Sequence, residues 1–322
     1  MNESTQLFRK ILVATDFSSC AAAALEQAAA LARLSQAEIT LAHAIPLTRE
    51  TMEEFVANPW YAAANVDEIE ERLQHGADER LLSAVSPFQG GGISLNFKTL
   101  WGTPFLEIIH LVQEEGYDLV VVGTRGHSPL SRFLVGSTAT KLVRKCPCPV
   151  LVAKPGPTGS LASILAPVDL TETSQKSLRT AALLAEASHG ELHALYVFDD
   201  DRDTKLPPLA LDLDVDEGLR RRQLRRRALQ QFEQFVGSLG LSVQPTLHLE
   251  RGVPWKRILA CARRVDANLT VMGTIGRGGV SGLLMGNTAE KVLHSAARSL
   301  LAVKPDSFVS PVQPRTASQH AY

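Results

Sequence analysis

Two glycine-containing stretches hold the residues of this sequence that are best suited to chemistry. The first, GTRGHSPLSRFLVGSTA at 123–139, follows an apolar run, and so does the second, GTIGRGGVSGLLMGNTA at 273–289. In both, a second glycine comes three residues after the first, nine residues intervene, and a third glycine precedes small polar residues. Because glycine has no side chain, backbone amides at such positions can approach an anion closely. The spacing therefore predicts phosphate binding.

The end of the first stretch opens a predicted helix. Gly136 precedes Ser137 and Thr138, and the first N–H groups of a helix have no partner inside it. An anion placed there gains from these donors and from the helix dipole. The two hydroxyls either cap the helix or donate to a phosphate. Arg125 and His127 lie inside the loop. Their side chains either contact a bound phosphate or are simply solvated.

The two stretches belong to an internal repeat. Segments 10–45 and 163–198 align without a gap, and Asp16 lies over Asp169. The glycine stretches follow at an offset of 150 residues. Each copy alternates apolar strand-like runs with helical periodicity, which is typical of a parallel sheet wrapped by helices. A length prior of about 150 residues per domain also gives two domains.

The repeat sets the expected elements and boundaries. Strands are expected near 10–15, 38–45, 93–100, 118–123 and 149–153, and then near 163–167, 191–198, 242–249, 269–273 and 300–304. Helices are expected near 18–35, 65–85, 103–115 and 137–146 in the first copy. The expected domains are 7–155 and 161–305, joined by a Pro- and Gly-rich linker at 156–160 and followed by a disordered tail at 306–322.

Two aspartates lie where a ligand would bind. Asp16 and Asp169 each close the first strand of a copy and precede Ser18 and Thr171. In an open parallel sheet, ligands bind outside the carboxyl ends of the strands. Each aspartate is therefore either a ligand contact or a turn residue at the start of a helix.

With these motifs the chain resembles the universal stress protein family in its tandem form. The resemblance rests on the glycine stretches, on ILVATDFS and ILAPVDLT, and on the closing segments CPCPVLVAK and ARSLLAVKP. It implies an α/β fold of two Rossmann-like domains, of the adenine nucleotide alpha hydrolase-like kind, each a five-stranded parallel sheet flanked by helices. It also implies bound ATP, with Mg²⁺ where the ion bridges phosphates. The family pairs domains through the last strand, which here would join 149–153 to 300–304 within one chain, and a homodimer stays open.

The resemblance assigns site residues in both copies. In the first, Asp16 and the Ala44 backbone would meet adenine, and the ribose and phosphates would be held by Gly123, Gly126, Gly136, Ser137 and Thr138. The matching positions in the second copy are Asp169, Val197, Gly273, Gly276, Gly286, Asn287 and Thr288. Asn287 replaces a serine, which weakens the expected second site.

Composition favours an ordinary globular protein. Apolar residues make up 45% and charged residues 21%, and the net charge is −1, so no global field draws the chain to nucleic acid or to a membrane. No run approaches the roughly 18 apolar residues of a membrane span, and a cytoplasmic protein is expected. Cys146 and Cys148 are expected to be buried thiols. The arginines at 220–227 favour a solvated helix over an RNA or lipid patch. The core stripe of this helix is expected to consist of Leu219, the 223/224 pair, Ala228, Phe232 and Phe235.

Three functions remain open from the sequence. The first is an ATP-binding stress regulator that acts through protein partners. The second is a structural or interaction module that binds no nucleotide. The third is an enzyme of the related adenylyl-transferring folds, which is the weakest because the sequence has neither a His-x-Gly-His nor a Ser-Gly-Gly-x-Asp-Ser element. Otherwise at most slow ATP hydrolysis or autophosphorylation is expected, for which the sequence offers no catalytic residue and no metal-ligand cluster.

Overall fold

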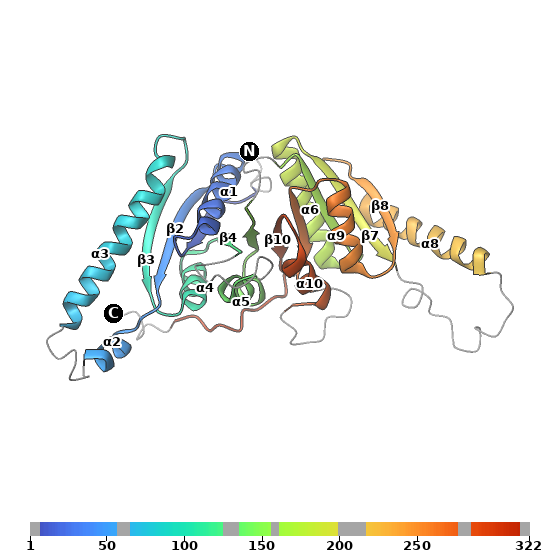
Figure 1. The fold of residues 1–322 in the computed structure, drawn as a ribbon. Helices are drawn as coiled ribbons and strands as arrows, with labels where there is room; N and C mark the ends of the chain where they lie inside the picture. The colour runs from blue at the N-terminus through green and yellow to red at the C-terminus, as the bar shows by residue number, and fades with distance from the viewer. Residues whose placement is uncertain are drawn as a thin grey trace. The chain divides into compact units, whose positions relative to one another are not determined.

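The computed structural model describes residues 7–56, 65–124, 135–155, 161–198, 217–275 and 285–315 (Figure 1). The chain forms two compact units, one of Met1–Gly159 with Ser307–Tyr322 and the other of Ser160–Asp306. The first boundary between the units falls at the end of the expected linker 156–160, which lies outside the described residues.

The first unit contains a parallel sheet in the order β3-β2-β1-β4-β5. Its strands are β1 (Lys10–Thr15), β2 (Glu38–Ile45), β3 (Leu95–Trp101), β4 (Leu119–Gly123) and β5 (Val150–Ala153). Its helices are α1 (Ser19–Ser35), α2 (Arg49–Val56), α3 (Val66–Val85), α4 (Pro104–Glu115) and α5 (Ser137–Lys145), with a short 3₁₀ turn η2 (Ser86–Phe88). Right-handed crossovers place α1 and α3 on one face of the sheet and α4 and α5 on the other.

The second unit repeats this order as β8-β7-β6-β9-β10, again with parallel strands. Its strands are β6 (Ser163–Val168), β7 (Glu191–Phe198), β8 (Thr246–Arg251), β9 (Leu269–Gly273) and β10 (Ser299–Val303). Its helices are α6 (Glu172–Ser188), α8 (Glu217–Gly237), α9 (Pro254–Arg264) and α10 (Asn287–Ser295). By the same crossover rule, α6 and α8 cover one face and α9 and α10 the other. The α/β fold expected from the sequence is confirmed.

Strand burial explains why the apolar runs predicted the sheet well. Every residue of β4 is buried, and so is every residue of β5, β6 and β10. A parallel sheet covered by helices on both faces requires such continuous apolar strands. Helix starts follow the sequence too, because Ser18 caps α1 and Thr171 forms a capping box with Ser174 at α6.

Three elements differ from the sequence expectation. Helix α2 was not expected, and it is one short amphipathic segment. Strand β8 begins at Thr246 rather than 242, because Pro245 has no N–H to donate to a strand ladder. The expected core stripe of α8 starts at Ala228, which is 5% exposed, whereas Leu219 is 50% exposed, so the prediction for Leu219 is wrong.

The expected thiol burial is confirmed. Cys146 and Cys148 are both buried and reduced, with their sulfur atoms 3.5 Å apart. The contact with Cys146 and burial raise the pKa of the Cys148 thiol well above its usual value, so this thiol stays protonated. In the described part of the chain, no three His, Cys, Asp or Glu residues are grouped as a metal site would need. None of the helices described there is long and apolar enough to cross a bilayer.

The chain beyond β10 differs from the expected disordered tail 306–322 as far as residue 315. Ser310 donates its hydroxyl to the carbonyl of Lys145 at the end of α5, at 2.8 Å. Gln113 of α4 donates its amide to the carbonyl of Val312 at 2.9 Å, and Val312 is 8% exposed. Residues 310–315 therefore lie along α4 and the end of α5, and 316–322 lie outside the described residues.

An ion pair fixes the end of this described tail. Arg315 pairs with Glu107 of α4 and lies 3.8 Å from Glu114. The Glu107 side chain is 10% exposed. A carboxylate this buried requires a charged partner, and the tail supplies it. No local sequence pattern indicates this pair, because its partners are 208 residues apart.

Candidate functional site

The candidate site of the first unit lies where β1, β2 and β4 end. Strand β1 is between β2 and β4, with Thr15 opposite His43 and Ala14 opposite Val122. The chain leaves β1 through Asp16 and leaves β4 through the glycine stretch. The sheet therefore brings the aspartate and the start of the glycine loop to one edge, as ligand sites in open parallel sheets require.

A strained turn follows β1. Asp16 accepts a hydrogen bond from the backbone N–H of Ser18 at 3.0 Å, and the N–H of Phe17 donates to the hydroxyl of Thr15 at 3.0 Å. Phe17 has φ of 65°, in the left-handed region that non-glycine residues seldom adopt. This turn fixes the direction of the Asp16 carboxylate at the start of α1.

The second unit has the same turn at the matching positions. Asp169 accepts from the N–H of Thr171 at 3.3 Å, and Leu170 has φ of 61°. A left-handed aromatic or aliphatic residue costs free energy wherever it occurs. Its presence at one position of both copies is typical of a site that depends on this backbone shape.

Gly123 brings the end of β4 against the first turn of α1. A Cβ on Gly123 would lie 2.7 Å from both the carbonyl carbon and the oxygen of Cys20. Only glycine allows this approach of two backbone segments. At the matching Gly273, the nearest atom is instead a methyl carbon of Thr173, at 2.7 Å. Both glycines therefore shape the site by close packing.

The two ends of each glycine loop are joined by one backbone hydrogen bond. Gly136 donates its N–H to the carbonyl of Thr124 at 2.6 Å, and Gly286 donates to that of Thr274 at 2.7 Å. Both threonines are buried. The loop therefore begins and ends at fixed points beside β4 or β9. Arg125, Gly126, His127 and Gly276 lie outside the described residues.

Glycine also occupies the N-cap of the helix after each loop. At α5 the cap is Gly136, with φ −61° and ψ 157°, and no side chain caps the first turn. That turn contains no acidic residue, whereas the first turn of α10 contains Glu290. Since a helix N-terminus carries partial positive charge and open N–H donors, the start of α5 is the better anion site.

The first unit adds an aromatic and cationic cluster that sequence reasoning missed. The rings of Phe17 and His43 have centroids 4.4 Å apart, and the guanidinium carbon of Arg80 on α3 lies 4.0 Å from the Phe17 centroid. Phe17 could have been noticed between Asp16 and Ser18. Arg80 could not have been predicted as part of this cluster, because nothing in the sequence links α3 to this turn.

The structure brings together most of the residues that the sequence selected. In the first unit, Asp16 and Phe17 are half-buried and Ala44 is buried beside His43. The described site residues are Asp16, Ala44, Gly123, Gly136, Ser137 and Thr138 in the first unit, and Asp169, Val197, Gly273, Gly286, Asn287 and Thr288 in the second. Ser137 and Asn287 are both exposed at the start of their helices, so each can reach a bound group.

We expect the stability of the first unit to fall as the pH falls toward the acid side of neutrality. Burial lowers the pKa of His43 below its usual 6.5, against the raising effect of its hydrogen bond to the Thr15 carbonyl. The unfolded chain therefore takes up the proton first, and stability present above pH 6.5 is lost below it. The urea concentration at the midpoint of unfolding should differ less between about pH 7.5 and about pH 5.5 in His43→Gln than in the parent protein.

The exposed His75, on α3, provides the control for this experiment. His75→Gln should keep the pH dependence of the parent protein, because its side chain is 77% exposed. An unchanged pH dependence in His43→Gln would contradict the assignment to His43.

Comparison with known proteins gives one consistent result. A sequence profile described as the Universal stress protein family matches residues 7–154 and 161–304. The chain is 28% identical over 238 residues to Universal stress protein E of Escherichia coli K12, covering 70% of this chain and 73% of the relative. It is 30% identical over 298 residues to a universal stress protein of Mycolicibacterium smegmatis, covering 92% and 97%.

One solved structure shares the fold over most of the chain. A universal stress protein from Archaeoglobus fulgidus DSM 4304 aligns over 92% of this chain and 98% of its own, with 23% identity and a TM-score of 0.63. A universal stress protein solved in complex with cAMP aligns over 45% of this chain and 98% of its own, with 16% identity and a TM-score of 0.31.

Proposed function

Because the chain belongs to the universal stress protein family, with one family domain in each half, we propose that it binds ATP. In this proposal it acts in the cytoplasm as a nucleotide-dependent regulator that works through protein partners. One observation carries the proposal: both units keep a strained turn after the first strand and a glycine loop closed by one hydrogen bond. This strain lies in the turn that holds an aspartate at the ligand edge of each sheet, and its position there supports a binding role.

The residues present fit a nucleotide. At the start of α5, uncapped amides, the Ser137 hydroxyl and the Thr138 hydroxyl would hold the phosphates. Asp16 and the backbone of Ala44, at the ends of neighbouring strands, would contact adenine. Mg²⁺ would enter with the phosphates, since the described residues offer no group of three ligands for it.

The first unit is the stronger site in this proposal. Glu290 in the first turn of α10 places negative charge near the second anion site, and Asn287 stands where the first unit has Ser137. Arg80 adds a cation beside the first site. We therefore expect the first unit to bind ATP more tightly than the second.

Thermal unfolding with and without Mg-ATP tests the proposal. At a ligand concentration 100-fold above the dissociation constant, a site in the folded state stabilises it by about 2.7 kcal/mol. A rise in unfolding temperature with Mg-ATP is the expected result. No shift at millimolar nucleotide, together with no nucleotide released from the denatured protein, would overturn ATP binding.

Two matched variants assign the shift to a unit. Gly136 has an extended backbone that valine adopts freely, and so does Gly286, with φ −75° and ψ 149°. Gly136→Val and Gly286→Val should therefore fold, while their branched side chains cover the helix amides. We expect Gly136→Val to remove most of the ATP-dependent shift and Gly286→Val to remove less.

A second function keeps some support from the structure. Gly123 contacts the Cys20 backbone, and Asp16 closes a turn with Ser18, so both residues have a structural use without a ligand. This favours, as the alternative, an interaction module that binds no nucleotide. Slow phosphate release from Mg-ATP, lost in Gly136→Val, would instead support a weak ATPase.

A further inference from the structure

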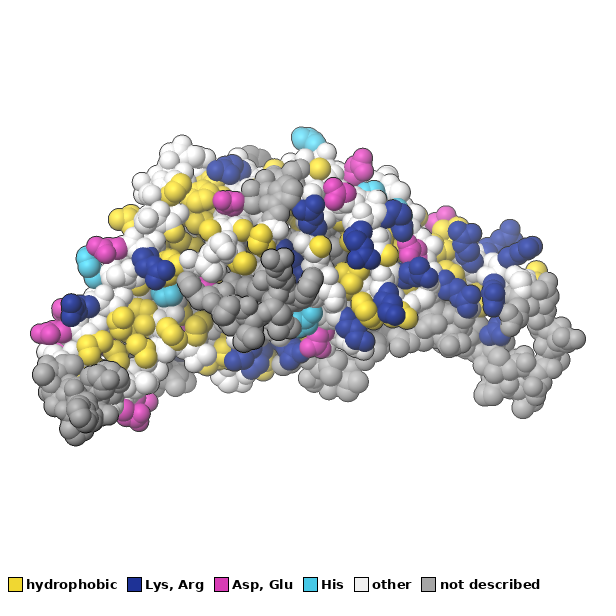
Figure 2. All heavy atoms as spheres, viewed as in Figure 1, with side chains coloured by type: hydrophobic (Ala, Val, Ile, Leu, Met, Phe, Trp, Pro, Cys, Tyr) yellow, Lys and Arg dark blue, Asp and Glu magenta, His cyan; other side chains and the backbone are white. Residues whose placement is uncertain are grey.

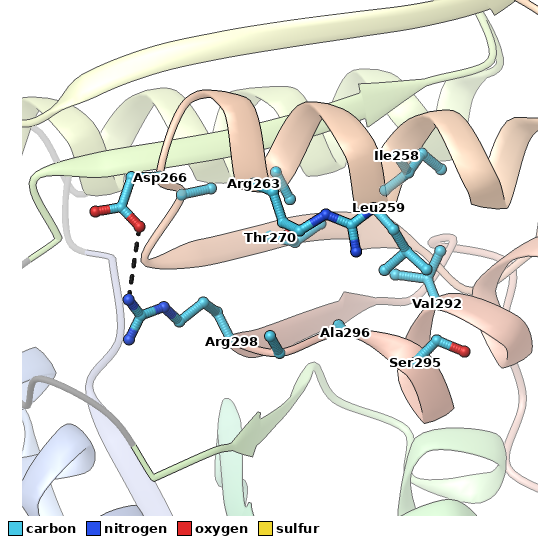
Figure 3. A pocket seen from close by; sticks show the side chains of 12 residues that line it. Ile258, Leu259, Arg263, Asp266, Thr270, Val292, Ser295, Ala296 and Arg298 are labelled. Atoms are coloured by element: carbon cyan, nitrogen blue, oxygen red, sulfur yellow. Dashed lines mark ion pairs between the residues drawn. The ribbon is translucent and has the colours of Figure 1, made fainter. Parts of the chain in front are cut away.

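The second unit has a groove of about 420 Å³ between α9 and α10. Ile258 and Arg263 of α9 form one wall, Val292 of α10 and the following Arg298 form the other, and Thr270 of β9 lies at the base (Figure 3). These residues lie toward the end of α9, whereas the glycine loop meets the start of α10. The groove is therefore separate from the candidate nucleotide site of this unit.

The internal repeat identifies the same groove in the first unit. At the offset of 150 residues, Arg263 corresponds to Gln113 and Ser295 corresponds to Lys145. Gln113 and Lys145 are the residues that hydrogen-bond to the tail, at Val312 and Ser310 respectively. The α4–α5 groove of the first unit is thus filled by an extended segment of the chain, residues 310–315.

Smaller side chains help to keep the second groove open. Ala262 stands where the first unit has Val112, and Val292 stands where it has Leu142. Ile258 and Val292 are buried, while Arg263 is exposed at the rim. The groove therefore has buried apolar walls and a polar rim, like the apolar core and polar rim of a protein interface.

Beside the groove, the charge on α9 is opposite to the charge at the matching positions of α4. Arg315 of the tail meets Glu107 and Glu114 in the first unit, and the corresponding residues of α9 are Arg257 and Arg264. Figure 2 shows Lys and Arg side chains gathered over α9, whose basic residues are Lys256, Arg257, Arg263 and Arg264.

Part of this positive charge is left for a ligand. Arg264 pairs with Glu250 at 2.6 Å, and Arg298 lies 3.5 Å from the exposed Asp266. Within the described ranges, the Arg263 guanidinium has no acidic partner. In Figure 3, Arg263 and Arg298 extend from opposite walls of the groove.

We propose that the α9–α10 groove binds an extended acidic segment of a partner protein, in the way that the α4–α5 groove holds residues 310–315. Small apolar residues of the segment fill the space over Thr270. Its carboxylates meet Arg263 and Arg298 in the groove. They also meet Arg257 and Arg264 beside it, where the tail of this chain would bring Arg315 against like charge.

Two labelled synthetic peptides, both capped at their ends, test this with the full chain. One has the tail sequence 307–315, and the other carries Ser310→Asp and Arg315→Glu in that sequence. Fluorescence anisotropy should show that the acidic peptide binds at least about tenfold more tightly than the parent peptide, because two exposed ion pairs replace repulsion. Raising the salt concentration should weaken the acidic peptide more.

Variants of the full chain locate the binding. The double variant Arg263→Glu and Arg298→Glu should weaken the acidic peptide about tenfold or more, and Ala262→Trp should weaken it by filling the groove. Arg225→Glu on the exposed face of α8 is the matched control and should leave affinity unchanged. Thermal unfolding confirms that each variant folds.

Four results would overturn the proposal. The first is that neither peptide binds at millimolar concentration, and the second is that both bind with equal affinity. The third is that the acidic peptide binds the double variant as tightly as it binds the parent chain. If the acidic peptide binds only after deletion of residues 201–214, an acidic segment of this chain is the occupant, and the assignment to a partner protein is wrong.

Discussion

Gly123→Ala should destabilise the first unit far more than Gly273→Ala destabilises the second. The new Cβ of Gly123→Ala would lie 2.7 Å from the backbone carbon and oxygen of Cys20, and backbone atoms cannot rotate away. Either the end of β4 or the first turn of α1 must move. Overpacking of this kind costs about 1–3 kcal/mol, and we expect the upper part of that range. Urea unfolding of both variants measures the difference.

The same variant should lose ATP binding by the first unit. Movement of the first turn of α1 displaces Ser18, whose N–H holds the carboxylate of Asp16. A small displacement of a positioned group is enough to remove a large part of its binding contribution. The ATP-dependent thermal shift of Gly123→Ala should therefore fall to that of the second unit alone.

The second unit supplies the control. In Gly273→Ala the contact is with the methyl group of Thr173, which a side-chain rotation or Thr173→Ser removes, so the cost should be about 1 kcal/mol or less. Equal destabilisation by Gly123→Ala and Gly273→Ala would show that the backbone contact with Cys20 is not the deciding feature.

The sequence predicted the sheet well because burial on both faces makes parallel strands continuous apolar runs. The run at 119–122 and its repeat gave β4 and β9 nearly residue for residue. The repeat supported the same set of strands in both copies, whereas their order in the sheet came from the structure. Helix α2 left no comparable signal, because a short exposed helix needs little apolar surface.

The candidate site was predictable only where its residues are neighbours in sequence. Asp16 and Gly136 stand in motifs that the chain shows twice. The left-handed φ of Phe17 and the position of Arg80 over its ring depend on tertiary packing, which no local pattern records. The pairing of Arg315 with Glu107 also depends on tertiary packing. A polar, proline-containing tail is predicted to be disordered when the surface that it packs against is unknown.

Arg315→Met should destabilise the first unit by about 3 kcal/mol, which is the lower end of the cost of breaking a buried ion pair. The variant leaves Glu107, whose side chain is 10% exposed, without its charged partner. We choose the lower end because the Arg315 side chain is 27% exposed and water can screen the pair. For a unit of this size, the unfolding temperature should fall by about 6–12 °C.

A second substitution separates lost charge pairing from lost packing. Glu107→Gln in the Arg315→Met background removes the unpaired carboxylate, so the double variant should recover most of the lost stability, since replacing both members of a buried pair is often nearly neutral. Ending the chain after Asp306 should cost more than Arg315→Met, because it also removes the buried Val312 and two hydrogen bonds. An Arg315→Met protein as stable as the parent would mean that the tail does not hold Glu107 in solution.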